Sequence, residues 1–557
     1  MKQQSVTQAF INCHTHVFTG DHVPPHLGKK MLPGPIGYIL TIPLVVNFFR
    51  WWYYRVKPLY FGRTARRLRK RYYEAGLWLH RYKAISLLLT LAGIILTIDA
   101  LLIIIAWGGE FLSYETQFRE VTAFFYRWHL LPSSPLLQYG IIILVLLIIP
   151  SGRNLVWFVA SRTLRLLKVL PGPKTRQYLI RYMSIGRFAF YRKQHNIFHT
   201  LTRQYPLRTR FVILPMDMDH MDAGRPRSNY MQQLAELKKL RRNNPDTALP
   251  FVFADPRRIA ADPGYMQTIR ECMEKEHFRG IKTYPALGYY PFDKDLLPLM
   301  LYACEHDIPV LNHCIRGVIF YRGEKKKEWN YHPVFSQATD DEKLQLFQKK
   351  NVDFSTNFTH PLNYLCLLDE KRLRQLLIHY NDPALFSLFG FRDAGTPLEK
   401  DLSRLKICFG HFGGEDEWLR YLESDRDLRN NNLQFHPDRG LNFSEDSALE
   451  GIWRYASWFS IIYSLMLQYP NVYADISYIL HDARTHPLLK TTLLPQSGIA
   501  DRVLFGTDFY VVRNQLSDKQ IWTNMVAALS PEELTQMAVL NPRRFLFNRI
   551  HGEVDQA

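Results

Sequence analysis

Phe10-Ile11-Asn12-Cys13-His14-Thr15-His16-Val17-Phe18 is the stretch on which the interpretation of this chain depends. It is a short apolar strand that ends in two histidines separated by one residue. Because side chains alternate along a strand, His14 and His16 point to the same side. Two neutral imidazoles that converge on one point are suitable ligands for a divalent transition metal. The stretch therefore predicts part of a metal site at a strand end.

Seven further strand-like runs follow, and helical segments separate them. They cover residues 210–216, 250–254, 280–285, 309–313, 405–411, 472–477 and 503–508. Strands that alternate with helices predict parallel βα units, and eight such units predict an α/β fold, a closed (β/α)₈ TIM-like barrel. Chemistry in that fold lies at the carboxyl ends of the strands. Three further candidate residues follow apolar strands there, namely His313, His411 and Asp508.

Several short motifs lie at these strand ends in a characteristic order. They are HTH at 14–16, GIKTYP at 280–285, LNHC at 311–314, GHFGG at 410–414, LFGTDF at 504–509 and NPRRFL at 541–546. Together they resemble the amidohydrolase superfamily, in its amidohydrolase-related (amidohydrolase 2) branch. The resemblance covers about residues 8–18 and 205–548. The chain departs from that family by an insertion between the first two strands.

The resemblance implies a catalytic metal, with Zn²⁺ as the expected ion and one ion per chain favoured. His14, His16, His313 and Asp508 would be the metal ligands. Asp508 would also accept a proton from the activated water, and His411 would act as acid/base or polarise the substrate carbonyl. Another divalent metal, or a two-metal site, is the alternative.

Lys282 has two interpretations under this resemblance. In two-metal members a lysine at this strand is carbamylated and bridges the ions, whereas in the amidohydrolase-related branch it often has no metal role. A substrate contact is a further role for Lys282. Asp217, Arg316 and His360 are the other candidate substrate contacts, and an ordinary structural role is the alternative for each. Asp508 could likewise be a simple helix N-cap.

The domain organisation follows from the insertion. Residues 1–18 hold the first barrel strand, 19–204 form a membrane-associated insertion, and 205–557 form the rest of the barrel, the catalytic domain. Two apolar runs, 85–107 and about 136–160, are long enough to be predicted transmembrane helices. Their flanks, 50–84 and 161–193, are rich in Lys and Arg, which predicts an integral membrane protein with a cytoplasmic catalytic domain.

The formal net charge of +19 is explained mainly by these flanks. The basic residues of 63–71 are expected to lie against the anionic headgroups of a lipid bilayer, and nucleic acid is not an expected partner. Asp99 inside the first span indicates a polar partner in the membrane, consistent with a homo-oligomer. Six scattered cysteines without a CxxC pair indicate reduced thiols.

The function predicted from these features is a membrane-anchored, metal-dependent hydrolase of an amide, lactone or ester-type bond. The insertion leaves the same barrel face as the metal site, so a lipid-like substrate is as plausible as another small molecule. Residues 320–350 and 415–450 are expected to be extended loops over the mouth. One alternative is a non-oxidative decarboxylase, although the GHxGE pattern of such enzymes is displaced by one residue in Gly410–Glu415. The other is a non-catalytic membrane sensor or scaffold.

Overall fold

The computed structural model describes most of the chain. The described residues are 9–26, 43–51, 55, 62–111, 123–124, 127, 132, 134–166, 191–316, 321–337, 342–348, 350–423, 436 and 438–547. The chain divides into two compact units, one of residues 1–47 with 180–557 and one of residues 48–179. The second unit is shorter at both ends than the predicted insertion, 19–204.

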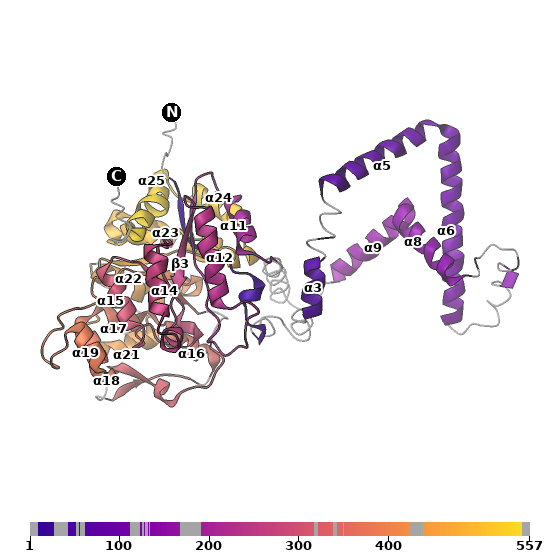
Figure 1. The fold of residues 1–557 in the computed structure, drawn as a ribbon. Helices are drawn as coiled ribbons and strands as arrows, with labels where there is room; N and C mark the ends of the chain where they lie inside the picture. The colour runs from indigo at the N-terminus through magenta and orange to yellow at the C-terminus, as the bar shows by residue number, and fades with distance from the viewer. Residues whose placement is uncertain are drawn as a thin grey trace, which may run out of the picture. The chain divides into compact units, whose positions relative to one another are not determined.

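The first unit contains an eight-stranded parallel sheet (Figure 1). In spatial order the strands are β1 (Ile11–Thr15), β2 (Arg210–Ile213), β3 (Ala248–Phe253), β4 (Gly280–Thr283), β5 (Val310–Ile315), β8 (Ile407–Gly413), β9 (Val472–Asp475) and β10 (Val503–Leu504). Each pair of neighbours is parallel and consecutive among these strands, as repeated βα units require.

The sheet closes on itself through the segment that follows β10. The backbone N–H of Cys13 donates to the carbonyl of Phe505 at 2.8 Å, and Asp508 N–H donates to the carbonyl of His14 at 2.9 Å. These bonds join the first strand to the last. The predicted (β/α)₈ TIM-like barrel is therefore confirmed, and its closure brings Asp508 next to the end of β1.

Helices surround the strands of this unit. They are α11 (Gln194–Thr202), α12 (Tyr230–Asn243), α13 (Pro256–Ala261), α14 (Tyr265–Glu274), α15 (Leu297–Glu305), α16 (Asn351–Thr359), α17 (Leu365–Leu368), α18 (Glu370–Tyr380), α19 (Pro383–Phe389), α20 (Glu415–Leu422), α21 (Asp446–Tyr455), α22 (Trp458–Gln468), α23 (His486–Thr492), α24 (Asp518–Ala528), α25 (Pro531–Thr535) and α26 (Asn541–Leu546). Helix α12 illustrates why they form. Asn229 and Gln232 make a capping box, and Leu234, Leu237 and Leu240 bury one face.

Buried apolar side chains fill the barrel. One cluster of buried residues draws on seven of the strands and on α26: Ile11, Cys13, Val212, Leu214, Leu249, Phe251, Leu311, Cys408, Tyr473, Leu504, Phe545 and Leu546. Five of the six cysteines are buried and none is paired, as the scattered pattern predicted. The interior is thus a packed core, so a site can form only at the ends of the strands.

The two segments expected to be extended loops contain regular structure. Strands β6 (Tyr331–Ser336) and β7 (Lys343–Gln345) form an antiparallel hairpin inside 320–350. Helix α20 and the start of α21 fall inside 415–450, whereas 424–435 lie outside the described residues. The loop prediction was wrong for the hairpin because His332 and Phe335 are buried there and stack on one another, with ring centroids 4.0 Å apart.

The second unit is helical. It contains α5 (Arg63–Arg81), α6 (Lys83–Phe111), α8 (Pro135–Ile148) and α9 (Pro150–Leu166), while α3 (Pro43–Trp51) straddles the boundary between the units. Among the described residues, one helix is long and apolar enough to cross a membrane by length and composition, over Lys83–Trp107. The loop 108–135 and the basic flank 161–193 lie largely outside the described residues.

The second predicted span, about 136–160, is not one helix. Helix α8 ends after 14 residues, Ile149 is extended with ψ 137°, and α9 starts at Pro150. Proline lacks the N–H that a continuing helix needs, and it disfavours the helical conformation of the residue before it. At 1.5 Å per residue α8 is about 21 Å long, which is short of a ~30 Å hydrocarbon core. The described residues therefore do not support a two-helix transmembrane insertion.

His332 gives the folded barrel a specific pH dependence. Burial lowers the pKa of His332 to about 3, because the charged form would lose its hydration, although the hydrogen bond to Asn363 raises the pKa. Both ring nitrogens are used inside the protein: Nε2–H donates to Asn363 Oδ1 at 3.1 Å and Nδ1 accepts from Phe335 N–H at 3.0 Å. The unfolded chain therefore binds a proton below pH 6.5 that the folded chain does not bind. We expect this residue alone to cost about 2 kcal/mol of the free energy of unfolding between pH 7 and pH 5.

Chemical denaturation of the wild type and of His332→Gln at both pH values checks this prediction. The wild type should lose more stability on acidification than the variant by that amount. An equal loss in the two proteins would contradict a neutral His332 in the fold.

Candidate metal centre

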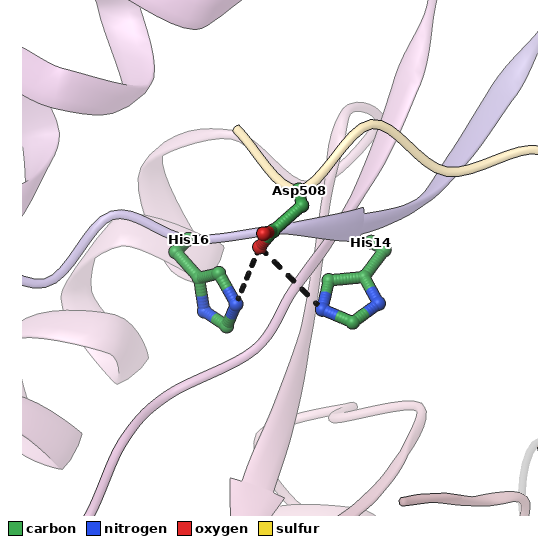
Figure 2. Close-up of side chains that lie close together, drawn as sticks. All are labelled: His14, His16 and Asp508. Carbon is green, nitrogen blue, oxygen red and sulfur yellow. Dashed lines mark ion pairs between the residues drawn. The ribbon is translucent and has the colours of Figure 1, made fainter. Parts of the chain in front are cut away.

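The end of β1 brings three potential metal ligands together (Figure 2). His14 lies in β1, His16 follows its last residue, and Asp508 follows β10. Asp508 Oδ1 lies 3.2 Å from His16 Nε2 and 3.8 Å from His14 Nε2. The three ligand atoms lie within 4.8 Å of one another, and all three residues are buried. The alternation rule predicted this convergence for the two histidines.

The other nitrogen of each imidazole is held by a hydrogen bond that fixes the ring. His14 Nδ1–H donates to Asp475 Oδ2 at 2.8 Å, and His16 Nδ1–H donates to the carbonyl of Leu214 at 2.8 Å. A carboxylate and a carbonyl can only accept, so each ring carries its hydrogen on Nδ1. Both Nε2 atoms therefore direct lone pairs toward Asp508. Buried carboxylate or carbonyl partners of this kind are typical of metal-binding histidines.

The three ligands fit a divalent cation. Two lone pairs and a carboxylate oxygen converge, and His14 Nε2 is a buried atom with no hydrogen-bond partner among the described residues. Without a positive charge at that point the electron pairs would repel, and a buried polar atom without a partner is costly. Imidazole nitrogens with a carboxylate suit zinc, manganese, iron and similar ions. These residues could therefore hold a divalent metal.

His411 and His313 continue the site from β8 and β5. His411 Nδ1 lies 3.2 Å from the carbonyl of Ser477, and its Nε2 lies 3.1 Å from His313 Nδ1. If the Ser477 carbonyl accepts from His411 Nδ1–H, then His411 Nε2 accepts from His313 Nδ1–H. The lone pair of His313 Nε2 is then left free, and this buried atom also has no hydrogen-bond partner among the described residues. His313 stacks on Tyr284, with ring centroids 3.8 Å apart.

The electrostatics keep His14, His313 and His411 neutral and Asp508 charged. Burial lowers the pKa of His14 to about 3, and it also lowers the pKa values of His313 and His411. Burial raises the pKa of Asp508, but the nearby histidines lower that pKa overall. Neutral imidazole and ionised carboxylate are the forms that bind a metal.

Two glycines allow the backbone to approach His14. A Cβ on Gly506 would lie 2.8 Å from His14 Cβ, and a Cβ on Gly410 would lie 2.9 Å from the carbonyl of Asn312. Beside these glycines, His411 and Asp508 adopt left-handed backbone conformations, with φ of 66° and 58°. Non-glycine residues with positive φ often cluster at functional sites. The motifs GHFGG and LFGTDF are therefore explained by the geometry around His14.

Residues 454–547 match the family model Amidohydrolase. That match supports a relationship between this segment of the chain and the amidohydrolase superfamily. No curated protein matches the chain.

Three solved structures illustrate what the chain resembles. A 2,6-dihydroxybenzoate decarboxylase from Rhizobium has 13% identity and a TM-score of 0.35, covering 68% of this chain and 93% of that one. A 5-carboxyvanillate decarboxylase from Novosphingobium aromaticivorans, with bound manganese, has 13% identity and a TM-score of 0.35, covering 64% and 84%. A putative amidohydrolase from Staphylococcus aureus has 11% identity and a TM-score of 0.32, covering 63% and 91%.

Lys282 lies on β4 and is fully buried. Its Nζ has no hydrogen-bond partner among the described residues, and burial lowers its pKa to about 8 although Asp475 and Asp508 raise it. The side chain is therefore close enough to both carboxylates to feel their charge. Its role as a carbamylated bridge or a substrate contact stays a prediction.

The other candidate substrate contacts, Asp217, Arg316 and His360, each interact with protein groups. Arg258 Nη2 donates to the buried Asp217 at 3.0 Å. Arg316 Nη2 lies 3.5 Å from Glu417 Oε1, and its guanidinium covers the Trp458 ring.

His360 is buried and bonded to the backbone through both ring nitrogens. Nε2–H donates to the carbonyl of Trp453 at 3.1 Å, and Nδ1 accepts from Leu362 N–H at 3.2 Å. These bonds cap the turn Pro361–Tyr364, so the structure favours the ordinary structural role of His360.

Asp475 is the residue that the sequence interpretation missed. It ends β9, and its two oxygens reach His14 Nδ1 and the backbone N–H of His411, which donates to Oδ1 at 3.1 Å. Ser477 Oγ also donates to Asp475. Although burial raises the pKa of Asp475, these partners hold it well below its ordinary value. The signal was present, because Asp475 follows an apolar strand just as Asp508 does.

Asp475→Asn tests this orienting role. Asparagine keeps the shape but presents a weaker acceptor, or a donor, to His14 Nδ1–H. We expect the dissociation constant for the metal to rise by roughly 10–100-fold. Competition with a chromophoric chelator measures it. The control Asp482→Asn changes a carboxylate that pairs with the exposed Arg484, and its metal affinity should stay at the wild-type value. Wild-type affinity in Asp475→Asn would contradict the role.

Proposed function

We propose that this chain is a metal-dependent hydrolase that acts on an amide, lactone or ester-type bond. One observation carries the proposal: the Nε2 lone pairs of His14 and His16 converge on the ionised Asp508, and the buried His14 Nε2 has no hydrogen-bond partner among the described residues. His14, His16 and Asp508 would hold the ion, and His313, whose Nε2 is also unpartnered, is the fourth candidate ligand. Zinc is the ion we propose, with manganese as the alternative.

The protein groups have separate tasks in the proposed reaction. When bound, a divalent ion in such a site acts as a Lewis acid that activates water and polarises a carbonyl. Asp508 is ionised, so its free oxygen can accept the proton that the attacking water loses. Asp475 fixes the His14 ring and tautomer. The proton that Asp508 takes up can then pass from this carboxyl to the leaving group, which leaves no net charge on the protein. His411, in hydrogen-bond contact with His313, is the candidate to assist this transfer or to polarise the substrate carbonyl.

Product analysis in ¹⁸O-labelled water tests the reaction type. The metal-loaded protein is incubated with a panel of amides, lactones, esters and hydroxybenzoates, and the masses of the products are measured by mass spectrometry. Hydrolysis places one ¹⁸O atom in the acid product. Release of CO₂ from a hydroxybenzoate without incorporation of label would replace this proposal by the decarboxylase alternative. Asp508→Asn is the control that identifies any activity from contaminants.

We also propose that the Lys83–Trp107 part of α6 anchors the chain in a membrane, with the barrel on the cytoplasmic side. This segment is long and apolar, and only 11% of its most apolar window is buried, unlike a core helix. Alkaline extraction of membranes tests the anchor. An anchored chain stays in the pellet, whereas release into the supernatant would contradict the proposal.

A further inference from the structure

Helix α5 (Arg63–Arg81), which precedes the apolar helix, has two chemically different exposed faces. We propose that α5 lies in the membrane–water interface and binds anionic phospholipid headgroups. The inference extends the proposed anchoring by α6, but it rests on separate residues and can fail independently of it.

Helix α5 carries a large excess of positive charge. Seven of its residues are basic and one is acidic: Arg63, Arg66, Arg67, Arg69, Lys70, Arg71 and Arg81 against Glu74. Residues 66–74 are all exposed. Lys70 lies 3.7 Å from Glu74, a pair whose side chains are largely exposed and which therefore neutralises little of this charge. A helix with this excess complements a negatively charged surface.

Four apolar residues of α5 share one face. At 100° per residue, Leu68, Tyr72, Ala75 and Leu79 fall within one narrow sector, whereas Arg67, Lys70 and Arg81 fall on the other side, which also carries Leu77. Leu68 is 60% exposed and Tyr72 is 67% exposed. An apolar stripe below a basic face is the pattern of helices that lie in the plane of a membrane interface.

Aromatic residues mark the end of α5 where it meets the apolar helix. Trp78 and Tyr82 are about half exposed, and their rings are in edge contact, with centroids 5.2 Å apart. Helix α6 begins directly afterwards, at Lys83. Tryptophan and tyrosine concentrate at the headgroup level of membranes. If α6 enters the bilayer at Lys83, α5 has no linker that would let it leave the headgroup region.

A lipid surface complements both the basic and the apolar face of α5, whereas nucleic acid or a protein groove would complement only one of them. Nucleic acid would use the basic residues but would leave Leu68 and Tyr72 in water. A protein groove would cover the apolar stripe but would need many acidic residues around it. An anionic bilayer offers hydrocarbon below its headgroups and negative charge at the same depth.

A fluorescent probe on each face tests the proposal in the full-length protein. The probe is attached at Tyr72→Cys, or at Lys70→Cys as the matched control, with the half-buried Cys304 replaced by Ser. The protein is reconstituted in phosphatidylcholine vesicles with or without phosphatidylserine, and the lipid carries a shallow spin-label quencher. We expect quenching at position 72 that increases with phosphatidylserine, and little quenching at position 70.

The triple variant Arg67→Gln, Lys70→Gln and Arg71→Gln adds a second measurement. Each basic residue near an anionic surface is worth about fivefold in binding, so this variant should lose the phosphatidylserine dependence, as should high salt. An unquenched probe at position 72, or equal quenching at 70 and 72, would overturn the proposal. Duplex RNA can be added in an amount that carries the same negative charge as the phosphatidylserine. If the RNA then abolishes the phosphatidylserine dependence of quenching at position 72, the basic face binds nucleic acid and the proposal is also overturned.

Retention of the protein on the vesicles after an alkaline wash reports on the membrane insertion of α6 alone. If retention fails while position 72 still responds to phosphatidylserine, the anchor is wrong and the assignment of α5 stands. If retention holds while position 72 stays in water, α5 is not an interfacial helix.

Discussion

Asp508→Asn is expected to lower turnover by roughly 10²–10⁴-fold while the metal stays bound. The amide keeps the size of the side chain and an oxygen for coordination, but it cannot accept a proton at neutral pH. Asp508 Oδ1 already faces both histidines, at 3.2 and 3.8 Å, so the other oxygen is the atom available for proton transfer. Turnover of the best substrate from the panel, measured beside metal content, checks this.

Asp501→Asn is the matched control for that variant. Asp501 pairs with Arg544 at 2.7 Å and is about half exposed, so its loss should leave turnover at the wild-type value. If Asp508→Asn keeps full turnover with its metal in place, Asp508 is not the proton acceptor and the proposed reaction is wrong.

His14→Ala/His16→Ala is expected to abolish metal binding. The change removes both imidazole ligands of the three-residue group and leaves Asp508, with His313 as one further candidate ligand, which are too few to hold a transition ion tightly. We expect metal content to fall to about a tenth of the wild type or less. Elemental analysis of the purified proteins measures it, and circular dichroism confirms that the barrel remains folded.

A histidine pair on α11 provides the control. His195 and His199 are exposed and stacked one turn apart, so His195→Ala/His199→Ala also removes two neighbouring imidazoles. This variant should keep the wild-type metal content. Retention of metal by the His14/His16 variant, or its loss from the α11 variant, would place the metal elsewhere.

The barrel and the proximity of three candidate ligands could be predicted because they depend on local rules. Apolar runs fixed the strands, and alternation placed His14 and His16 on one side of β1. Asp508 was found because strand ends meet at one edge of a parallel barrel. Asp475 obeys the same rule, but its partner is His14 Nδ1 on a strand far away in the sequence, and only the closed barrel shows that contact.

Other features depended on contacts that a sequence pattern does not contain. His360 resembled a site residue, but its two backbone hydrogen bonds come from separate segments. The second membrane span had the right composition over 136–160, yet Pro150 divides it into two helices. Composition therefore predicted the apolar character of that region better than its continuity. The hairpin of β6 and β7 was missed because its stability comes from burial of His332.

Metal stoichiometry of the detergent-purified wild-type protein is the most direct test of the central claim. We predict about one divalent transition ion per chain, with zinc or manganese identified by elemental analysis, since His14, His16 and Asp508 define one position. The second group of neighbouring ligand atoms, from His14, His411 and Asp475, is already joined by the hydrogen bond between His14 and Asp475. Two ions per chain would bring Lys282 back as a carbamylated bridge. A protein that holds no metal, even after reloading with zinc and with manganese, would contradict the account and favour a non-catalytic barrel.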